Sequence, residues 1–140
     1  SGNREKRLRS LVVSLRVPNV VFLGRLERTQ IHELYRSSDI FVNSSGTDNF
    51  PGALLEAFLF GLPIATTDAG GIPYMVEHGR TARMVGVDDH ESLAQEITYL
   101  LEHPEEAQRM ASEAQKNIED YRWEAVRDDW FNVLRAQPRR

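Results

Sequence analysis

The sequence predicts an α/β protein in which a parallel sheet of about four strands is flanked by helices. Short apolar segments rich in β-branched residues alternate along the chain with longer segments of helical periodicity. These short segments are continuously apolar, which is typical of strands buried on both faces of a parallel sheet. The predicted strands are residues 19–24, 39–43, 63–67 and 83–87. Such a sheet is Rossmann-like, and ligands bind beyond the carboxyl ends of its strands.

Length and composition limit the possible classes. With 140 residues, of which 41% are hydrophobic, the chain can bury one ordinary core, so we expect a single domain over residues 1–140. A net charge of -4 argues against general nucleic-acid binding. The absence of cysteine excludes disulfides and thiolate metal sites. We find no membrane-spanning run and no signal peptide, so we expect a cytoplasmic protein.

Helices are predicted before and between the first strands. The first is amphipathic with a basic face, and its pattern favours a solvated outer helix over a membrane or nucleic-acid patch. Its charged and apolar residues are Arg4, Lys6, Arg7, Arg9, Arg16, Leu8, Leu11, Val12 and Leu15. A second helix is capped by Thr29 and runs to about Ser37, with Tyr35 on its inner side.

The remaining helices follow the third strand. A short one covers residues 73–77, and Asp88 with Glu91 fits a capping box for a helix that ends near residue 102. Another covers about residues 104–119. The last begins near residue 121, and Trp123 and Trp130 are predicted to be core or docking residues. We expect the Arg139–Arg140 end to be frayed.

The loop after the second strand carries the main functional signal. Residues 44–50 are rich in turn formers, and Pro51 suits the first turn of a helix that runs to about Phe60, with Gly61 as its stop. That helix is apolar all round except for Glu56, so Glu56 must have partners or face a polar cleft. The first-turn amides, those of Gly52, Ala53 and Leu54, form a site suited to phosphate. Together these features suggest a phosphorylated, hydroxyl-rich ligand.

The same residues resemble the signature of a known family. Residues 48–56 (DNFPGALLE), followed by Gly61-Leu62-Pro63 and Gly70-Gly71-Ile72-Pro73, are similar to the family-4 (group 1) retaining glycosyltransferases of the GT-B fold. The resemblance covers nearly the whole chain and about the last two thirds of that family's donor domain. It implies transfer of a sugar from a nucleotide diphosphate sugar to a hydroxyl, with retention of configuration and without a metal.

The resemblance also implies residue roles. Asp48 would hydrogen-bond the donor sugar as the catalytic acidic residue, and Glu56 would hold the ribose. The rest of the nucleotide-sugar site would comprise Phe50, Pro51, Gly52, Ala53, Leu54, Gly70, Gly71 and Arg25. The amides near Pro51 would stabilise the departing diphosphate.

Simpler explanations remain open for these residues. Asp48 could cap the helix region, and Glu56 could pair with a surface arginine. The two glycines could serve only as a tight turn. Arg25 is better explained as a surface residue than as a phosphate clamp. The four histidines lack ligand spacing, and the serines lack a nucleophile-elbow pattern.

The chain also departs from the family pattern. Asp48 replaces a longer Glu, Asn49 a Gly, Tyr74 a Glu and Ala82 a Gly. The donor domain's first two strands and the whole acceptor domain have no counterpart here. We therefore expect residues 20–23 to pair beside the second predicted strand, with an open sheet edge that favours a homodimer.

The alternatives in function are a non-catalytic module that binds nucleotide sugars or a protein, and a sugar-nucleotide epimerase-like enzyme. Residues 1–140 could be an excised fragment or a natural short protein. The sequence identifies neither the donor base, the sugar nor the acceptor. We expect the chain alone to be inactive or nearly so.

Overall fold

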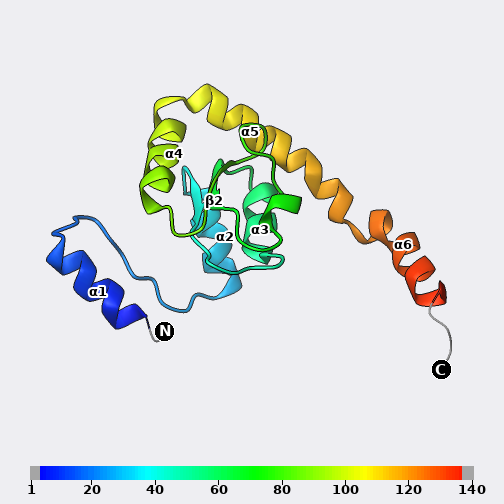
Figure 1. Cartoon of the computed structure of the whole chain (residues 1–140), viewed down its shortest axis with the longest axis horizontal. Coiled ribbons are helices and arrows are strands. Elements are labelled where there is room, and N and C mark those ends of the chain that lie inside the picture. Colours follow the sequence, from blue (N-terminus) through cyan, green and yellow to red (C-terminus); the bar gives the residue numbers. More distant parts are fainter. Residues whose placement is uncertain (1–3, 137–140) are drawn as a thin grey trace. The chain divides into compact units, whose positions relative to one another are not determined.

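A three-stranded parallel sheet organises the larger part of the computed structural model, which describes residues 4–136 (Figure 1). The strands β1 (Phe41–Asn43), β2 (Ile64–Thr67) and β3 (Arg83–Val85) lie in the order β1-β2-β3. All four residues of β2 are buried, as expected of a central strand covered on both faces. The α/β class and three of the four predicted strands are confirmed. The predicted frayed end at Arg139–Arg140 lies outside the described residues.

The first predicted strand is wrong. Residues 19–24 form no strand, and Asn19 (φ 62°) and Gly24 (φ 66°) at its two ends both adopt left-handed backbone conformations. Within residues 4–136, β1 pairs with β2 alone. The predicted pairing of residues 20–23 beside β1 would join two separate compact units and stays a prediction. Apolar composition predicted burial here, but a strand exists only where a neighbour supplies hydrogen-bond partners.

Contacts divide the chain into two compact units, residues 1–34 and residues 35–140. The first unit contains α1 (Glu5–Ser14) and the beginning of α2 (Arg28–Arg36). The Arg9 guanidinium lies 4.3 Å from the ring centre of Phe22 and forms an ion pair with Glu5 at 2.8 Å. The single domain over residues 1–140 stays a prediction.

The start of α2 differs from the prediction. Thr29 lies inside the helix, and the side chain of Gln30 accepts a hydrogen bond from the Glu27 N–H at 2.9 Å. That is one half of a capping box, made by Gln30 reaching back three residues. The predicted Thr29 cap is wrong because the helix begins at Arg28, two residues earlier than that cap requires.

The second unit begins at Tyr35 and continues through α3 (Gly52–Leu59). Gly61 ends α3 with φ 67°; its N–H donates to the Phe58 carbonyl at 3.0 Å, and the Leu62 N–H donates to the Ala57 carbonyl at 3.0 Å. This pair of bonds is a Schellman motif, so the predicted stop at Gly61 is confirmed.

Two further helices cover the sheet. These are α4 (His90–Glu102) and α5 (Pro104–Lys116). They bury Leu93, Leu100, Ala107 and Met110 in one cluster with Ala65 of β2. The cap of α4 is Asp89, which accepts from the Ser92 N–H at 3.0 Å, and not Asp88 as predicted. Asp88 has φ 65°, so it belongs to the preceding turn.

The remaining elements are two short turns of helix and the last helix. They are η1 (Ile72–Tyr74), η2 (Asn117–Tyr121) and α6 (Trp123–Ala136). Trp123 and Trp130 are 56% and 57% exposed, so the prediction that they lie in the core is wrong, and a docking role stays a prediction. Helical periodicity located α6 but not what it packs on. No helix within residues 4–136 is long and apolar enough to cross a membrane.

Candidate functional site

Loops that follow all three strands meet at the carboxyl edge of the sheet. They comprise residues 44–51, 68–71 and 86–89. The Thr67 hydroxyl donates to the Ser45 carbonyl at 2.6 Å, which ties the end of β2 to the first loop. The Val87 N–H donates to the Asp68 carboxylate at 2.9 Å, which ties the second loop to the third. The edge at which ligands bind in such sheets is therefore built as one connected surface.

Gly70 and Gly71 hold the second loop against the first. The Gly71 N–H donates to the Asp48 carbonyl at 2.9 Å. A β-carbon at Gly71 would lie 1.8 Å from the Asn49 carbonyl oxygen, and one at Gly70 would lie 2.3 Å from that of Asp48. Gly70 also has φ 54°, as the tight-turn interpretation expects. The approach of two backbones is a further reason for glycine, which neither the ligand nor the tight-turn interpretation included.

Asp48 has both its backbone and its side chain engaged. Its carboxylate accepts from the Phe50 N–H at 3.3 Å, which forms a turn of the Asx type. The residue that precedes α3 is Pro51, which makes no side-chain cap, so Asp48 does not cap the helix. The Asp48 side chain is half-buried at the loop edge, directly before the first turn of α3.

The sequence predicts an anion site at the first turn of α3, and that role stays a prediction. Gly52 and Ala53 are exposed, and the amides of a first helical turn lack intrahelical acceptors. The positive end of the helix dipole adds to these donors. The Leu54 N–H differs from the other two because it donates to the Pro51 carbonyl at 3.0 Å.

Glu56 lies one turn further along α3 and is exposed. The stripe of Ala53, Glu56 and Leu59 faces outward, so the prediction that α3 is buried on most sides is wrong. Leu54, Ala57 and Phe58 make its buried face. The sequence requires either partners or a polar cleft for Glu56, and its carboxylate lies beside the Tyr35 hydroxyl, where it contributes to the raised pKa of that tyrosine. In residues 4–136 Glu56 forms no ion pair with an arginine.

The sequence places Tyr35 on the inner side of its helix and gives it no role in the site. Its hydroxyl lies 3.2 Å from the Ala53 carbonyl as well as beside Glu56, and the residue is 9% exposed. Burial, followed by the hydrogen bond and negative charge of Glu56, raises the pKa of Tyr35 to about 12. Its periodic position in α2 predicted burial, but no local signal identified Glu56 as its partner.

The remaining predicted site residues differ in how exposed they are. Phe50 is exposed, with its ring 5.7 Å from that of Tyr121. Pro51 and Leu54 are buried. Arg25 is exposed in the first unit, and its role in the site stays a prediction.

Asn43, at the end of β1, is a second residue that sequence reasoning missed. Its side-chain oxygen accepts from the N–H and the hydroxyl of Ser45, at 3.2 and 2.7 Å. Its side-chain nitrogen is buried without a hydrogen-bond partner among the described residues. Asn43 therefore fixes the first two residues after β1, where the site loop begins.

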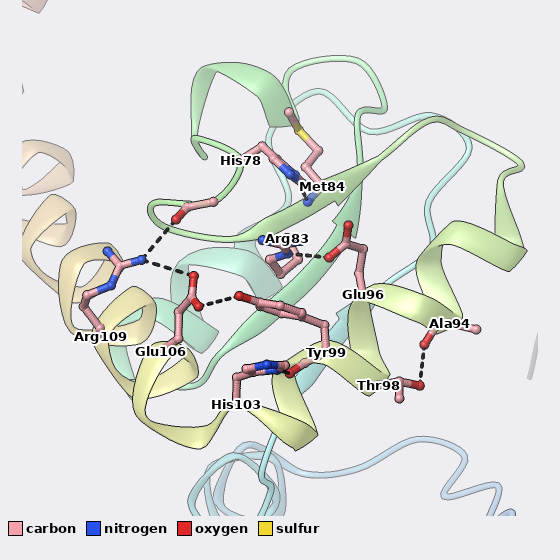
Figure 2. A network of polar contacts seen from close by, with 11 residues as sticks. His78, Arg83, Met84, Ala94, Glu96, Thr98, Tyr99, His103, Glu106 and Arg109 are labelled. Atoms are coloured by element: carbon pink, nitrogen blue, oxygen red, sulfur yellow. Dashed lines mark hydrogen bonds and ion pairs between the residues drawn. The ribbon is translucent and has the colours of Figure 1, made fainter.

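A separate polar network joins β3, α4 and α5 (Figure 2). Arg83 pairs with Glu96 and lies 4.2 Å from the ring centre of Tyr99, whose hydroxyl donates to Glu106. That bond raises the pKa of Tyr99 and lowers the pKa of Glu106. Arg109 donates to the Gly79 carbonyl at 3.2 Å. None of the predicted site residues belongs to this network, which braces the outer helices.

The site as a whole offers amide donors, a helix N-terminus and two acidic side chains on one edge. That set can bind phosphate through the backbone and hydroxyl groups through the carboxylates. No group of three or more histidine or acidic residues that could hold a metal ion occurs within residues 4–136.

Comparison with known proteins identifies the family. The model of the glycosyl transferases group 1 family matches residues 1–117. The chain belongs to the group 1 glycosyltransferases. An uncharacterized glycosyltransferase of Haemophilus influenzae is 28% identical over 136 residues, which are 96% of this chain and 38% of that protein.

Two further relatives have named sugars. A GDP-mannose-dependent alpha-mannosyltransferase of Mycobacterium tuberculosis is 31% identical over 120 residues, or 86% of this chain and 31% of that protein. The crystal structure of HepE from Anabaena with UDP-glucose superposes with a TM-score of 0.83 at 26% identity, over 97% of this chain and 38% of that one. These group 1 glycosyltransferases have the GT-B fold, which confirms the predicted family and architecture. The chain spans about a third of the length of the relatives that it matches.

Proposed function

We propose that this chain forms part of the nucleotide-sugar donor domain of a retaining glycosyltransferase. The observation that supports this most directly is the junction of the two motif loops. The backbones of Gly70 and Gly71 lie against Asp48 and Asn49, immediately before an exposed first turn of α3. An acidic side chain, free amides and Glu56 thus follow one another along one edge.

Each group would contact a different part of the donor. The amides of Gly52 and Ala53 would face the diphosphate, and Glu56 would accept hydrogen bonds from the ribose hydroxyls. Asp48 would bind hydroxyls of the transferred sugar. It is one methylene shorter than glutamate, so the sugar must lie correspondingly closer to the loop. Phe50, beside Asp48, offers an exposed ring to the same region.

The reaction proposed is transfer of a hexosyl group to a hydroxyl acceptor with retention of configuration. The acceptor oxygen forms the new bond to the anomeric carbon, the bond to the diphosphate breaks, and the acceptor proton passes to the departing nucleoside diphosphate. Amide dipoles at the N-terminus of α3 would stabilise the charge that gathers on the diphosphate, without a metal.

Residues 1–140 would be one partial domain of such an enzyme, and the acceptor-binding half would come from elsewhere. The chain covers about a third of its relatives. Alone it would bind donor but transfer little or no sugar. A transfer assay with this chain, first alone and then with a supplied acceptor domain, tests that division. Product from the chain alone would contradict it.

The direct test of the site is donor binding by ligand-observed NMR. Purified chain is mixed in turn with uridine, guanosine and adenosine diphosphate sugars, and saturation transfer is compared with that of Glu56→Gln. Glu102→Gln, an exposed glutamate on α4, is the matched control. We expect transfer to one donor, lost in Glu56→Gln and kept in Glu102→Gln. No transfer from any donor would refute the donor site.

Two other functions give different results in these assays. A non-catalytic module would bind a donor or a protein and form no product even with an acceptor domain supplied. An epimerase-like enzyme would release free nucleotide from the donor without an acceptor. Product that depends on both donor and acceptor domain distinguishes the transferase from both.

A further inference from the structure

Tyr35 connects the last turn of α2 to the outward face of α3. Its hydroxyl donates to the Ala53 carbonyl at 3.2 Å, and the Glu56 carboxylate lies beside the same hydroxyl. A hydrogen bond to an ionised acceptor is the stronger of the two kinds, so a hydroxyl placed beside both groups can donate to Glu56 in place of Ala53. The contact spans 21 positions in the sequence, so it exists only in the folded chain.

The ring of Tyr35 is fixed by its surroundings. It stacks on Phe60 with 5.2 Å between ring centres and 9° between planes, and it lies 5.9 Å from the ring of Phe41. The residue is 9% exposed. A tyrosine has few rotatable bonds, and burial between two rings removes most of that freedom. The hydroxyl therefore reaches the surface of α3 from a rigid base.

Glu56, in contrast, is exposed and has three rotatable bonds of its own. A glutamate on a helix surface samples several side-chain conformations unless a partner selects one. A carboxylate has two oxygens and about four acceptor sites, so one hydrogen bond from Tyr35 leaves room for two more. A 1,2-diol presents two donors at a spacing that one carboxylate can accept.

From this geometry we propose that Tyr35 is a positioning residue, which holds the Glu56 carboxylate in the orientation that accepts both hydroxyls of a bound ribose. The inference rests on the proposed donor site. It adds Tyr35, a residue outside the motif, to the site. Through Glu56, Tyr35 would make the site prefer nucleotides with an intact ribose diol. Tyr35 itself does not contact the ligand.

The first measurement needs no ligand. Tyrosine ring carbons are observed by ¹³C NMR in the full 140-residue chain and in Glu56→Gln. If the hydroxyl donates to Glu56, the carbon that bears the Tyr35 oxygen shifts in Glu56→Gln, and the tyrosine ionises at lower pH. An unchanged signal would overturn the inference before any ligand is added.

The second measurement separates positioning from stability. Binding of UDP and GDP is compared with that of their 2′,3′-dideoxy analogues, in wild type and in Tyr35→Phe, which keeps the ring. In wild type, loss of the diol should weaken the nucleotide that binds by about tenfold or more, as for hydrogen bonds to a charged group. In Tyr35→Phe this ratio should fall by about threefold or more, with the affinity for the dideoxy analogue unchanged.

Tyr99→Phe is the matched control because it removes the other hydroxyl that donates to a glutamate, on helices that carry no predicted site residue. Its diol ratio should equal that of wild type. An unchanged ratio in Tyr35→Phe, or equal weakening of diol and dideoxy ligands, would overturn the positioning role. If wild type binds neither nucleotide while the carbon signal shifts as expected, the donor site fails, the positioning role fails with it, and the Tyr35–Glu56 bond remains.

Discussion

At the scale of single residues, the glycine pair makes the sharpest prediction about stability. Gly71→Ala would place a β-carbon 1.8 Å from the Asn49 carbonyl oxygen, which is backbone and cannot rotate away. The two loops must then separate, and we expect a loss of about 2 to 3 kcal/mol in the free energy of unfolding. Urea denaturation measures it.

Gly52→Ala is the control for this substitution. Nothing lies within 4 Å of a β-carbon built there, and the position is helical. Alanine is the better helix former, so stability should change by less than about 1 kcal/mol, in the favourable direction. Equal losses in the two variants would show that the loops are not in the close contact described.

The raised pKa of Tyr35 predicts that the stability of the fold falls at alkaline pH. Its folded pKa of about 12 lies above the ordinary value of 10.0, so the folded state holds the phenol proton more tightly than the unfolded state does. That stabilisation is complete below about pH 10 and is lost as the pH rises through about 12. Urea unfolding at about pH 9 and about pH 11 should show the loss in wild type.

The same comparison in Tyr35→Phe should show a smaller loss over this range, because the variant has no phenol there. Other groups that titrate in the same range are common to both proteins and cancel. Identical pH dependence in the two proteins would mean that the tyrosine ionises normally when folded.

At the scale of elements, the cap of α4 can be tested against its neighbour in sequence. The Asp89 carboxylate accepts from the Ser92 N–H at 3.0 Å, and this hydrogen bond lowers the pKa of Asp89. Asp89→Ala should lower the melting temperature by a few degrees. The stabilisation exists above the ordinary carboxyl pKa and is lost as the pH falls through the lowered folded value.

Asp88→Asn serves as the comparison. Asp88 has φ 65°, a conformation that asparagine also tolerates, and its side chain is not the cap of α4. We therefore expect its melting temperature to stay near that of wild type. A larger effect at Asp88 than at Asp89 would restore the capping box that the sequence favoured.

Comparing the predicted with the observed elements shows which structural features local sequence determines. Signals that act within a few residues were read correctly: the apolar runs of β1, β2 and β3, and the stop of α3 at Gly61. Caps were misplaced by one or two residues, because adjacent acidic or hydroxyl residues compete for one helix terminus. The segment at residues 19–24 failed for a different reason, since strand formation depends on a neighbouring strand that composition does not reveal.

The candidate site likewise has some features that local sequence predicts and others that depend on the fold. Its loop and the exposed first turn of α3 at Gly52 and Ala53 could be predicted from local pattern. The expectation for Glu56 rested on burial of α3 on most sides, and Glu56 is exposed. Tyr35 could not be predicted, because its contacts with α3 join positions that only the fold brings together. The requirement for glycine at position 71 likewise depends on the path of another loop. Asn43 bonds Ser45, two positions away, so an Asx-type turn was the local signal that could have identified it.

At the scale of the whole molecule, the main feature is the edge of β1 that faces away from β2, where backbone groups lack a strand partner among the described residues. The Phe41 N–H donates to the Pro63 carbonyl at 2.9 Å, so in a parallel ladder the backbone groups of Val42 point to the other side. No strand pairs there within residues 4–136. We predict concentration-dependent self-association through this edge, measured by sedimentation velocity.

Val42→Pro tests the edge, because proline removes the outward N–H and leaves the hydrogen bonds of β1 to β2 in place. The variant should stay monomeric at concentrations where wild type associates. A wild-type chain that sediments as a monomer at every concentration would exclude the homodimer.

The setting of Tyr35 also determines how the protein responds to reagents that attack phenolates, such as tetranitromethane. Tyr35 is buried and keeps its proton, and hydrogen bonding or burial likewise raises the pKa of Tyr99 and Tyr121. Tyr74, the remaining one of the chain's four tyrosines, is 92% exposed and lies in η1, directly after the Gly70–Gly71 loop. Nitration should thus mark Tyr74 first, and place a single absorbing reporter beside the loops where the donor is proposed to bind.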